Sequence, residues 1–589
     1  MKTCFGYPYG VRGERELPLF EDLGLLFFTV LILSLLFTPF SMRLAFHIGA
    51  VDRPVDRSVH LKPMPRLGGL GMVVAILAGM LMFLEFEPVM IAFMAGLLVI
   101  AITGIADDVC QIRPLLKLSG EIVACILFIE ISGLSLTSFG DVLGFGEITF
   151  SAPLSYLITL FSMVGVINAF NLSDGLDGLA AGIIVIACLF LGILALQTHA
   201  WISLTLIAAL LGGVLGFLKF NSHPAHLFMG DTGSLMLGFS ITSISIILAT
   251  YESSGIKPIT IAIILGLPIV DTIWVMTRRL LQGKRLGSPD NTHLHHRLLA
   301  LGFPHPVAVT LLYVWVVMLG VLALSVKELP EHWQLLSGIV LCGVLYALLT
   351  LCEQKKVNVA SDISGIYELS GIHEVADISA ASAEGRKGRE GEEENRVLAR
   401  LLGQSMRLFP YVIGLGLCLP LLVADSIPAT LGKPALGLAL FVAIAFPWRE
   451  HQQHQHIIYG LFYLCGFTIL YAWNISSYHA FNLNIYIFLF GGLLLVWSFL
   501  KVKFKRRSEV FLTSGFELLL IFISWCLPYV ILPAMEVPEP VLNAAKLACL
   551  GAIPLLIAMK LVIRRQPHRN RSMAVGLILI LALIAVRAI

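Results

Sequence analysis

The sequence is poor in charge and lacks the cysteine patterns that hold metals or build disulfide scaffolds. Only 13% of its 589 residues are Asp, Glu, Lys or Arg, whereas soluble proteins carry about 25%, so a large soluble core is excluded. The 10 cysteines are scattered and form no Cys-x-x-Cys pair, which excludes a zinc knuckle. No Gly-x-x-x-x-Gly-Lys-Ser/Thr segment occurs either, so the chain is not a P-loop ATPase.

What the sequence does contain is apolar runs long enough to cross a bilayer. Hydrophobic residues make up 57% of the chain, and short strands of alternating polarity are absent, which favours helices over a barrel. We therefore predict an all-α, polytopic integral membrane helical bundle. About eleven runs fall in the first part of the chain, at roughly 22–40, 68–84, 89–106, 118–134, 153–170, 178–196, 201–218, 234–250, 257–276, 308–325 and 334–351. About seven more follow residue 408.

A polar stretch divides these two sets of runs. It has no hydrophobic period and contains Glu-Gly-Arg-Lys-Gly-Arg-Glu-Gly-Glu-Glu-Glu at 384–394, a composition typical of a flexible loop. We predict a membrane-embedded domain at 1–352, a hydrophilic cytoplasmic linker at 353–407 and a second membrane domain of unassigned function at 408–589.

The distribution of Lys and Arg predicts the orientation. The loops at 41–66 and 277–297 are rich in Lys and Arg, whereas the loops at 85–88 and 135–152 contain neither. Positively charged loops stay in the cytoplasm, so we place the N-terminus outside and read the run at 22–40 as an anchor rather than a cleaved signal. Counting spans forward then places the polar clusters described next on the cytoplasmic side.

Acidic clusters interrupt the apolar runs near their ends. They are Asp107-Asp108, the segment Asn-Ala-Phe-Asn-Leu-Ser-Asp-Gly-Leu-Asp-Gly at 168–178, Asp231 and Asp271. A carboxylate at the centre of a membrane helix costs about 2.5–3.5 kcal/mol, so such groups usually serve a function. Simpler readings stay open: a solvated interface for Asp107-Asp108, a helix N-cap for Asp231, and, as the better reading of Asp271, an ion pair with Arg278 or Arg279.

Histidines and basic residues complete the polar set. His293, His295 and His296 lie in a basic loop, where they suit anionic phosphates better than a helical zinc pair, although a merely solvated loop is the alternative. The loop at 52–69 is basic and rich in proline. Carboxylates beside many cations suit a diphosphate held through Mg²⁺, which prefers one or two protein carboxylates plus substrate phosphates.

Five motifs in order resemble the polyprenyl-phosphate N-acetylhexosamine-1-phosphate transferase family over residues of about 20–350. They are Pro-Met-Pro-Arg-Leu-Gly-Gly at 63–69, Asp107-Asp108, the segment at 168–178, Phe-Met-Gly-Asp-Thr-Gly-Ser at 228–234 and Ser-Pro-Asp-Asn-Thr-His-Leu-His-His at 288–296. The last motif is similar to that of the WecA and TagO branch. The segment from about 353 onward has no counterpart in the short members of the family.

The resemblance implies roles for individual residues. It implies a metal site at Asp231 and Asn171 for Mg²⁺, with Mn²⁺ as an alternative. The implied catalytic residues are Asp107, Asp108, Asp231, His293, His295 and His296. The implied substrate-binding residues are Lys62, Arg66, Asn168, Asn171, Asp174, Asp177, Lys117 and Arg297. Lys117 follows the aspartate pair at a looser spacing than the family's lysine.

The resemblance also implies an activity. We expect transfer of N-acetylhexosamine-1-phosphate, most plausibly GlcNAc-1-phosphate, from a UDP-sugar to undecaprenyl phosphate at the cytoplasmic face of the bacterial inner membrane, which starts cell-surface polysaccharide synthesis. A transporter or flippase for a lipid-linked glycan is the alternative. No nucleic-acid partner is expected. Three roles stay open for the C-terminal domain: formation of a homodimer, binding of a partner in polysaccharide assembly, and a second activity.

Overall fold

The computed structural model describes residues 18–52, 63–83, 87–251, 255–283 and 292–354, together with the isolated positions 539, 542, 543 and 546. The chain divides into two compact units, residues 1–300 with 307–355, and residues 301–306 with 356–589. The predicted linker and C-terminal spans lie almost wholly outside the described residues, so their predicted partners stay predictions. The fold below is that of the first unit.

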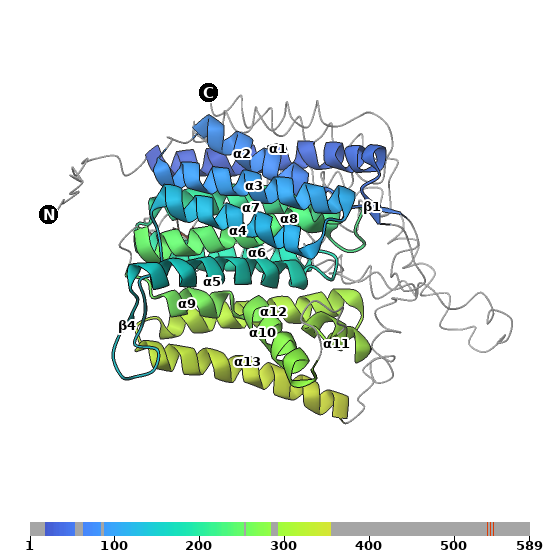
Figure 1. Cartoon of the computed structure of the whole chain (residues 1–589). Coiled ribbons are helices and arrows are strands. Elements are labelled where there is room, and N and C mark those ends of the chain that lie inside the picture. Colours follow the sequence, from blue (N-terminus) through green and yellow to red (C-terminus); the bar gives the residue numbers. More distant parts are fainter. Residues whose placement is uncertain are drawn as a thin grey trace, which may run out of the picture. The chain divides into compact units, whose positions relative to one another are not determined.

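The described part of the first unit is a helical bundle, as predicted (Figure 1). Its first eight helices are α1 (Pro18–Ile48), α2 (Gly68–Phe83), α3 (Pro88–Cys110), α4 (Pro114–Ser132), α5 (Ala152–Ser173), α6 (Leu179–Gln197), α7 (Trp201–Asn221) and α8 (Gly230–Ile246), which a π-helical turn extends as η1 (Ile247–Tyr251). The others are α9 (Pro258–Ile264), α10 (Gly266–Leu281), α11 (Leu294–Ala300), α12 (His305–Val326) and α13 (Glu331–Gln354).

Each of the eleven apolar runs predicted before residue 352 corresponds to a helix or to the pair α9–α10. Within the described ranges, 8 helices are long and apolar enough to cross a membrane, or 9 if the pair α9–α10, bent by 81°, forms one span. Helix α2 is shorter, with 16 residues, and α4 carries Lys117, Glu121 and Glu130. The predicted domain boundary at 352 falls inside α13, which continues to Gln354.

Helix α8 forms the centre of the bundle, where it contacts α2, α3 and α5. Two glycines allow this close packing because a side chain at either would strike the backbone of α8. A Cβ at Gly69 would lie 2.1 Å from the Gly233 nitrogen, and one at Gly104 would lie 2.3 Å from the Thr232 Cα. The N-terminus of α8 is therefore pressed between the ends of α2 and α3.

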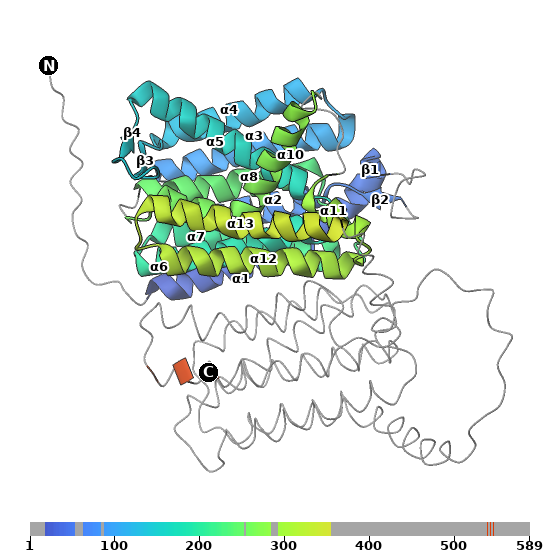
Figure 2. The same ribbon diagram turned by 90° about the horizontal axis from the view of Figure 1, so that it is seen from below.

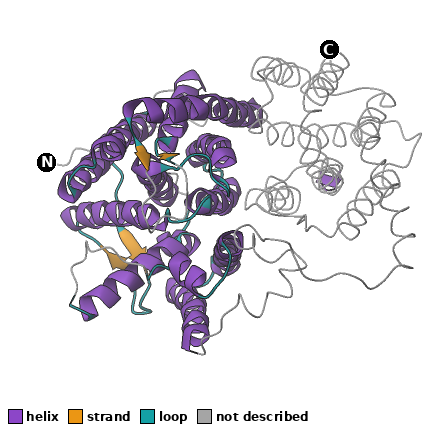
Figure 3. Cartoon of the chain, turned by 90° about the vertical axis from the view of Figure 1, so that its right-hand side faces the viewer, coloured by secondary structure: helices purple, strands orange, loops and turns teal. Residues whose placement is uncertain are grey.

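Two small antiparallel hairpins lie at opposite ends of the bundle. Strands β1 (Val51–Asp52) and β2 (Met64–Pro65) pair Val51 with Pro65, and β3 (Ser138–Gly140) pairs with β4 (Ile148–Thr149). Figures 1 and 2 agree that β1 lies at the same end as α11, whereas β4 lies at the other end. Figure 3 looks at the end that carries β1. The polar motifs at residues 107, 174 and 231 belong to helix ends that meet there.

Candidate active site

Four predicted residues meet where α3, α4, α5 and α8 come together. The Lys117 Nζ lies 2.6 Å from the Asp231 Oδ1 and 3.2 Å from the Asp107 Oδ2. Asn171 donates from Nδ2 to the same Asp231 oxygen at 2.6 Å, and to the Ser234 Oγ at 2.8 Å. One lysine thus bridges two carboxylates, and an amide orients one of them. We call Asp107, Lys117, Asn171 and Asp231 the carboxylate cluster.

Asp108 plays a different part from its neighbour. Its side chain is buried, and its Oδ1 accepts the Asp231 N–H at 2.8 Å, while its Oδ2 accepts the Thr232 N–H at 3.0 Å and the Thr232 hydroxyl at 2.6 Å. A carboxylate that accepts the first amides of a helix acts as an N-cap. Here α3 caps α8, so Asp108 rather than Asp231 fills the N-cap role. Its predicted part in catalysis stays untested.

Arg66 and Asp174 flank the carboxylate cluster. The Arg66 guanidinium lies 3.9 Å from the Asp231 Oδ2. Burial, followed by the charges of Asp231, Asp108 and Asp177, raises the pKa of Asp174 to about 7, and Arg66 opposes this shift. A carboxyl with a pKa near neutrality changes its charge readily when a cation arrives. Asp174 is therefore poised to respond to whatever binds beside Asp231.

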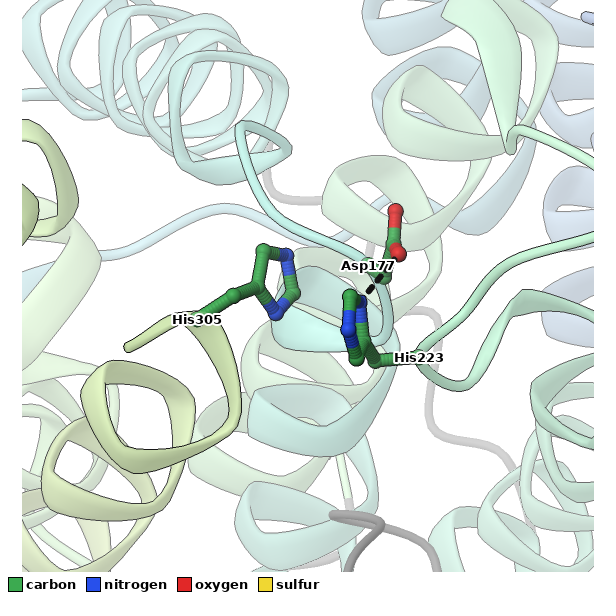
Figure 4. A group of neighbouring side chains, drawn as sticks. All are labelled: Asp177, His223 and His305. Atoms are coloured by element: carbon green, nitrogen blue, oxygen red, sulfur yellow. Dashed lines mark hydrogen bonds and ion pairs between the residues drawn. The ribbon is translucent and has the colours of Figure 1, made fainter. Parts of the chain in front are cut away.

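Asp177, predicted to bind substrate, belongs to a neighbouring network (Figure 4). Its Oδ2 lies 2.8 Å from the His223 Nδ1 and accepts the Ala225 N–H at 3.1 Å. The next residue, Gly178, has a φ of 77° and donates its N–H to the Asn221 Oδ1 at 2.9 Å. Asp177 thereby ties the turn after α5 to the loop between α7 and α8. Sequence reasoning missed His223 and Asn221.

Asn168 bonds to Glu121, a buried acid outside the carboxylate cluster that sequence reasoning missed. Its Nδ2 donates to the Glu121 Oε2 at 2.5 Å and to the Val164 carbonyl at 2.9 Å. Glu121 is 1% exposed and lies one helical turn after Lys117 in α4. An ionisable residue within an apolar run is by default a functional candidate, and this signal could have identified Glu121.

The histidine loop, residues 292–297, is held by side chains of α10 and α13. The His293 Nδ1 lies 2.8 Å from the Asp271 Oδ2, while the Asp271 Oδ1 accepts the Leu294 N–H at 3.1 Å and the Tyr346 hydroxyl at 2.8 Å. This corrects the prediction that Asp271 pairs with Arg278 or Arg279, because its described hydrogen bonds go to the loop and to α13. Asp271 and His293 are 22 residues apart, and no local sequence pattern predicts their contact.

Arg297 was predicted to bind substrate, but its guanidinium engages α13. It donates from Nε to the Glu353 Oε1 at 2.7 Å, and from one terminal nitrogen to the Glu353 Oε2 at 2.9 Å and to the Thr350 hydroxyl at 3.1 Å. A bidentate interaction between a guanidinium and a carboxylate is strong and fixes the orientation of both groups. Arg297 therefore anchors the histidine loop in this structure.

The histidine loop reaches the turn between α5 and α6, residues 174–178, through His295; we call this segment the aspartate turn. The His295 ring is buried, and a Cβ on Gly175 would lie 2.1 Å from its Nε2. The rings of His293 and His295 are parallel within 8°, with centroids 5.9 Å apart, and the centroid of His296 lies 4.2 Å from that of His295. His295 thus packs against Gly175, the residue after Asp174. Lys62 and residues 288–291 lie outside the described residues.

The carboxylate cluster has the donors that a hard divalent cation requires. Asp107 and Asp231 offer carboxylate oxygens that already converge on one positive charge, the Lys117 ammonium, and Asn171 adds an amide. Mg²⁺ takes oxygen ligands and completes its shell with substrate phosphates and water. The residues present therefore fit Mg²⁺, and they fit Mn²⁺ for the same reason.

Comparison with known proteins shows which family this chain is similar to. The family model described as "Glycosyl transferase family 4" matches residues 90–249. The "Probable undecaprenyl-phosphate N-acetylglucosaminyl 1-phosphate transferase" of Bacillus subtilis (strain 168) is 39% identical over 304 residues, which cover 51% of this chain and 84% of that protein. The "Decaprenyl-phosphate N-acetylglucosaminephosphotransferase" of Mycolicibacterium smegmatis is 33% identical and covers 50% of this chain and 80% of its own length.

A more distant relative has the same kind of name. The "Undecaprenyl-phosphate alpha-N-acetylglucosaminyl 1-phosphate transferase" of Escherichia coli (strain K12) is 29% identical over 325 residues, 54% of this chain and 88% of that protein. Fold and site define a multi-pass membrane protein with an acidic, lysine-bridged cluster at one end of its bundle. The chain belongs to the family of polyprenyl-phosphate N-acetylglucosamine-1-phosphate transferases. These relatives give no support to the transporter alternative.

Proposed function

We propose that this protein transfers GlcNAc-1-phosphate from UDP-GlcNAc to undecaprenyl phosphate and releases UMP, the first step of a cell-surface polysaccharide. The observation that carries the proposal is the 39% identity to the Bacillus relative over 84% of that protein's length. The assembly of Asp107, Lys117, Asn171 and Asp231 from four helices supports it, because Asp107, Asn171 and Asp231 belong to three of the motifs that carry the family resemblance.

The reaction joins two anions. An oxygen of the lipid phosphate attacks the sugar-bearing phosphorus of UDP-GlcNAc, and a new P–O bond forms. The bond from that phosphorus to the bridging oxygen breaks, and the bridging oxygen leaves with UMP. Phosphoryl transfer depends mainly on positioning and on neutralisation of charge, so cations near the path matter most. Lys117 and Arg66 supply them in the described site.

We propose that Asp107 orients the attacking lipid phosphate. A phosphate monoester has a second pKa of about 6, so it is largely a dianion at neutral pH and needs no strong base to remove a proton. Lys117 holds the Asp107 Oδ2 at 3.2 Å, which keeps this carboxylate fixed beside Asp231. Orientation of the acceptor therefore explains Asp107 better than general base catalysis does.

We also propose that Mg²⁺ binds at Asp231 and Asn171 together with the donor diphosphate. When bound, it would neutralise charge on the diphosphate and on the leaving UMP. Lys117 would then turn from the Asp231 carboxylate toward the phosphates, since its ammonium is a mobile point charge on a flexible stem. Binding of Mn²⁺, followed by its electron paramagnetic resonance signal, should weaken at least tenfold in Asp231→Asn and stay unchanged in Glu328→Gln, an exposed acid in the loop between α12 and α13.

The site is proposed to face the cytoplasm. The loops at 41–66 and 277–297 carry the basic residues, and β1 and α11, which flank the site, lie at one end of the bundle (Figure 1). UDP-sugars are made in the cytosol, so this orientation gives the donor direct access. The inner membrane of a bacterium is the corresponding location for undecaprenyl phosphate.

The test uses purified full-length protein with UDP-GlcNAc, undecaprenyl phosphate and Mg²⁺. We expect UMP and a lipid-linked diphospho-GlcNAc in equal amounts, with no UMP when the lipid phosphate is omitted. Release of UDP in place of UMP would mean that the sugar carbon, rather than phosphorus, is attacked. A protein that moves lipid-linked glycans without chemistry would release neither nucleotide.

A further inference from the structure

We propose that Asp271 is a positioning residue of the phosphotransfer site, which acts through His293, and that α13 is the support that holds it in place. This inference rests on the proposed function. Asp271 lies on α10 and is buried, as is His293 on the histidine loop. Tyr346, from α13, is also buried and closes the chain of contacts. We call Tyr346, Asp271 and His293 the relay.

The hydrogen bonds of Asp271 fix which ring nitrogen of His293 carries the proton. The Asp271 Oδ1 accepts the Tyr346 hydroxyl and the Leu294 N–H, which leaves Oδ2 for the His293 Nδ1 at 2.8 Å. A carboxylate only accepts hydrogen bonds, so the His293 Nδ1 carries a hydrogen. Its Nε2 is then the atom through which the ring serves the site. A carboxylate that orients a histidine in this way controls catalysis without touching the substrate.

Packing couples the position of the His293 ring, which Asp271 fixes, to the aspartate turn. The His293 plane is parallel to that of His295 within 8°, and the His295 Nε2 occupies the space that a Cβ on Gly175 would need. Gly175 follows Asp174, whose charge interacts with Asp231. A shift of the His293 ring would therefore disturb the turn beside the carboxylate cluster.

Helix α13 supports the relay with one face. Tyr346, Thr350 and Glu353 are spaced by four and three residues, so they lie on the same side of the helix. Tyr346 holds Asp271, whereas Thr350 and Glu353 hold Arg297. The Arg297 guanidinium also lies 5.7 Å from the centroid of the Tyr346 ring. The loop is thus fastened at both ends: Arg297 bonds directly to α13, and His293 is linked to α13 through Asp271 and Tyr346.

Neither fastening makes a described hydrogen bond to the carboxylate cluster, so support and chemistry rest on different contacts. None of the described hydrogen bonds of Asp271 or Tyr346 reaches Asp107, Lys117 or Asp231. Substitutions in the relay should consequently lower turnover and leave the affinity for UDP-GlcNAc nearly unchanged. A residue that touched the donor would alter both.

The decisive variant is Asp271→Asn in the full-length protein. Its amide keeps the shape and still accepts from Leu294 and Tyr346, but it presents a donor to the His293 Nδ1 and so forces the other tautomer. We expect kcat to fall about 10- to 100-fold, as for other partners that orient a histidine, with KM for UDP-GlcNAc changed less than about threefold. Tyr346→Phe, which removes one hydrogen bond and keeps the ring, should lower kcat about three- to tenfold.

A double-mutant cycle with His293→Gln distinguishes positioning from mere structure. If Asp271 acts through His293, Asp271→Asn causes no further loss in the His293→Gln background, because groups that act as a unit are not additive. Additive losses would overturn the inference, as would an Asp271→Asn enzyme with near-normal kcat. If Asp271→Asn does not fold, Tyr346→Phe in the same cycle decides the matter, with additivity again overturning the inference.

Two controls match the chemical changes. Tyr156→Phe removes a hydroxyl that bonds to Glu130, and Asp141→Asn neutralises an acid that belongs to the hairpin loop after β3. Both should retain wild-type kcat. A wild-type protein that releases no UMP refutes the proposed function, and the inference falls with it; an active wild type puts only the inference at stake.

Discussion

The carboxylate cluster and the histidine loop are built in different ways. The first is positioned by the backbone: Asp108 accepts the opening amides of α8, and Gly104 lets α3 touch that same turn. The second is positioned by side chains, since Asp271 bonds to His293 and Glu353 bonds to Arg297, at the start of α11 and within it. Backbone packing tolerates almost no change in shape, whereas a side-chain grip can be loosened stepwise.

Removal of the bridging cation should have the largest effect. Lys117→Met leaves Asp107 and Asp231 facing each other without the ammonium, which lies 3.2 Å from Asp107 and 2.6 Å from Asp231. We expect UMP release to fall about 10²- to 10³-fold, the loss typical of a group that stabilises transition-state charge. Lys327→Met, at an ion pair with Glu328 outside the site, is the control. A Lys117→Met enzyme within tenfold of wild type would mean that the bridge is incidental.

A methyl group between α3 and α8 should mainly affect stability. In Gly104→Ala the new Cβ would lie 2.3 Å from the Thr232 Cα, and backbone cannot move aside as a side chain can. Overpacking of this kind costs about 1–3 kcal/mol, and we expect the upper end of that range in denaturant unfolding. Gly165→Ala is the matched control, because nothing lies within 4 Å of its Cβ position. Equal stabilities for the two variants would remove the claim that backbone contact sets the cluster.

The same change beside the histidine loop should spare stability and affect turnover. In Gly175→Ala the obstacle is the His295 Nε2, 2.1 Å away, and this side chain can swing out. We expect a loss of activity of about tenfold with a change in unfolding free energy below about 1 kcal/mol, since a flexible group relieves the clash. The rate of UMP release and a melting curve together measure this. Greater damage to folding than in Gly104→Ala would reverse the comparison.

The pH dependence of stability reports on the carboxylates themselves. The pKa of Asp174 rises from 3.8 to about 7 on folding, so the folded protein binds more protons than the unfolded chain between these values. Unfolding free energy therefore falls as pH increases from about 4 to about 7 and stays lowered above that. Asp174→Asn should flatten this part of the profile when melting temperature is followed without divalent cations. An unchanged slope in the variant would assign the effect to another group.

The residues alone were enough to predict the helical bundle and the acidic clusters at its helix ends, for a physical reason, whereas the roles of Lys117 and Asn171 came from the family resemblance. Apolar runs must become helices in lipid, and acids cannot sit there without a purpose, so Asp107 and Asp231 stood out. The bend at 81° between α9 and α10 was not visible in the run at 257–276, although Pro268 within it is a helix breaker. The length of an apolar run does not show whether its helix is bent.

The contacts of the histidine loop could not be predicted, because they join residues far apart in the chain. Arg297 and Glu353 are separated by 56 positions and Asp271 and Tyr346 by 75, and no local pattern encodes such pairs. Asp271 therefore looked like an ordinary helix-end acid beside Arg278 and Arg279. For Glu121 the local signal was present, since an acid inside an apolar run is a functional candidate, but its pairing with Asn168, 47 positions away, was not visible in the sequence.

The most direct test of the central claim is the rate of UMP release by full-length Asp231→Asn compared with Glu328→Gln, both in saturating UDP-GlcNAc, undecaprenyl phosphate and Mg²⁺. Asp231 joins Lys117 and Asn171 in the cluster, whereas the Glu328 side chain is 86% exposed. We predict that Asp231→Asn folds but releases UMP at least about 10³-fold more slowly, while Glu328→Gln matches wild type. A folded Asp231→Asn protein that turned over at a near-normal rate would contradict the account.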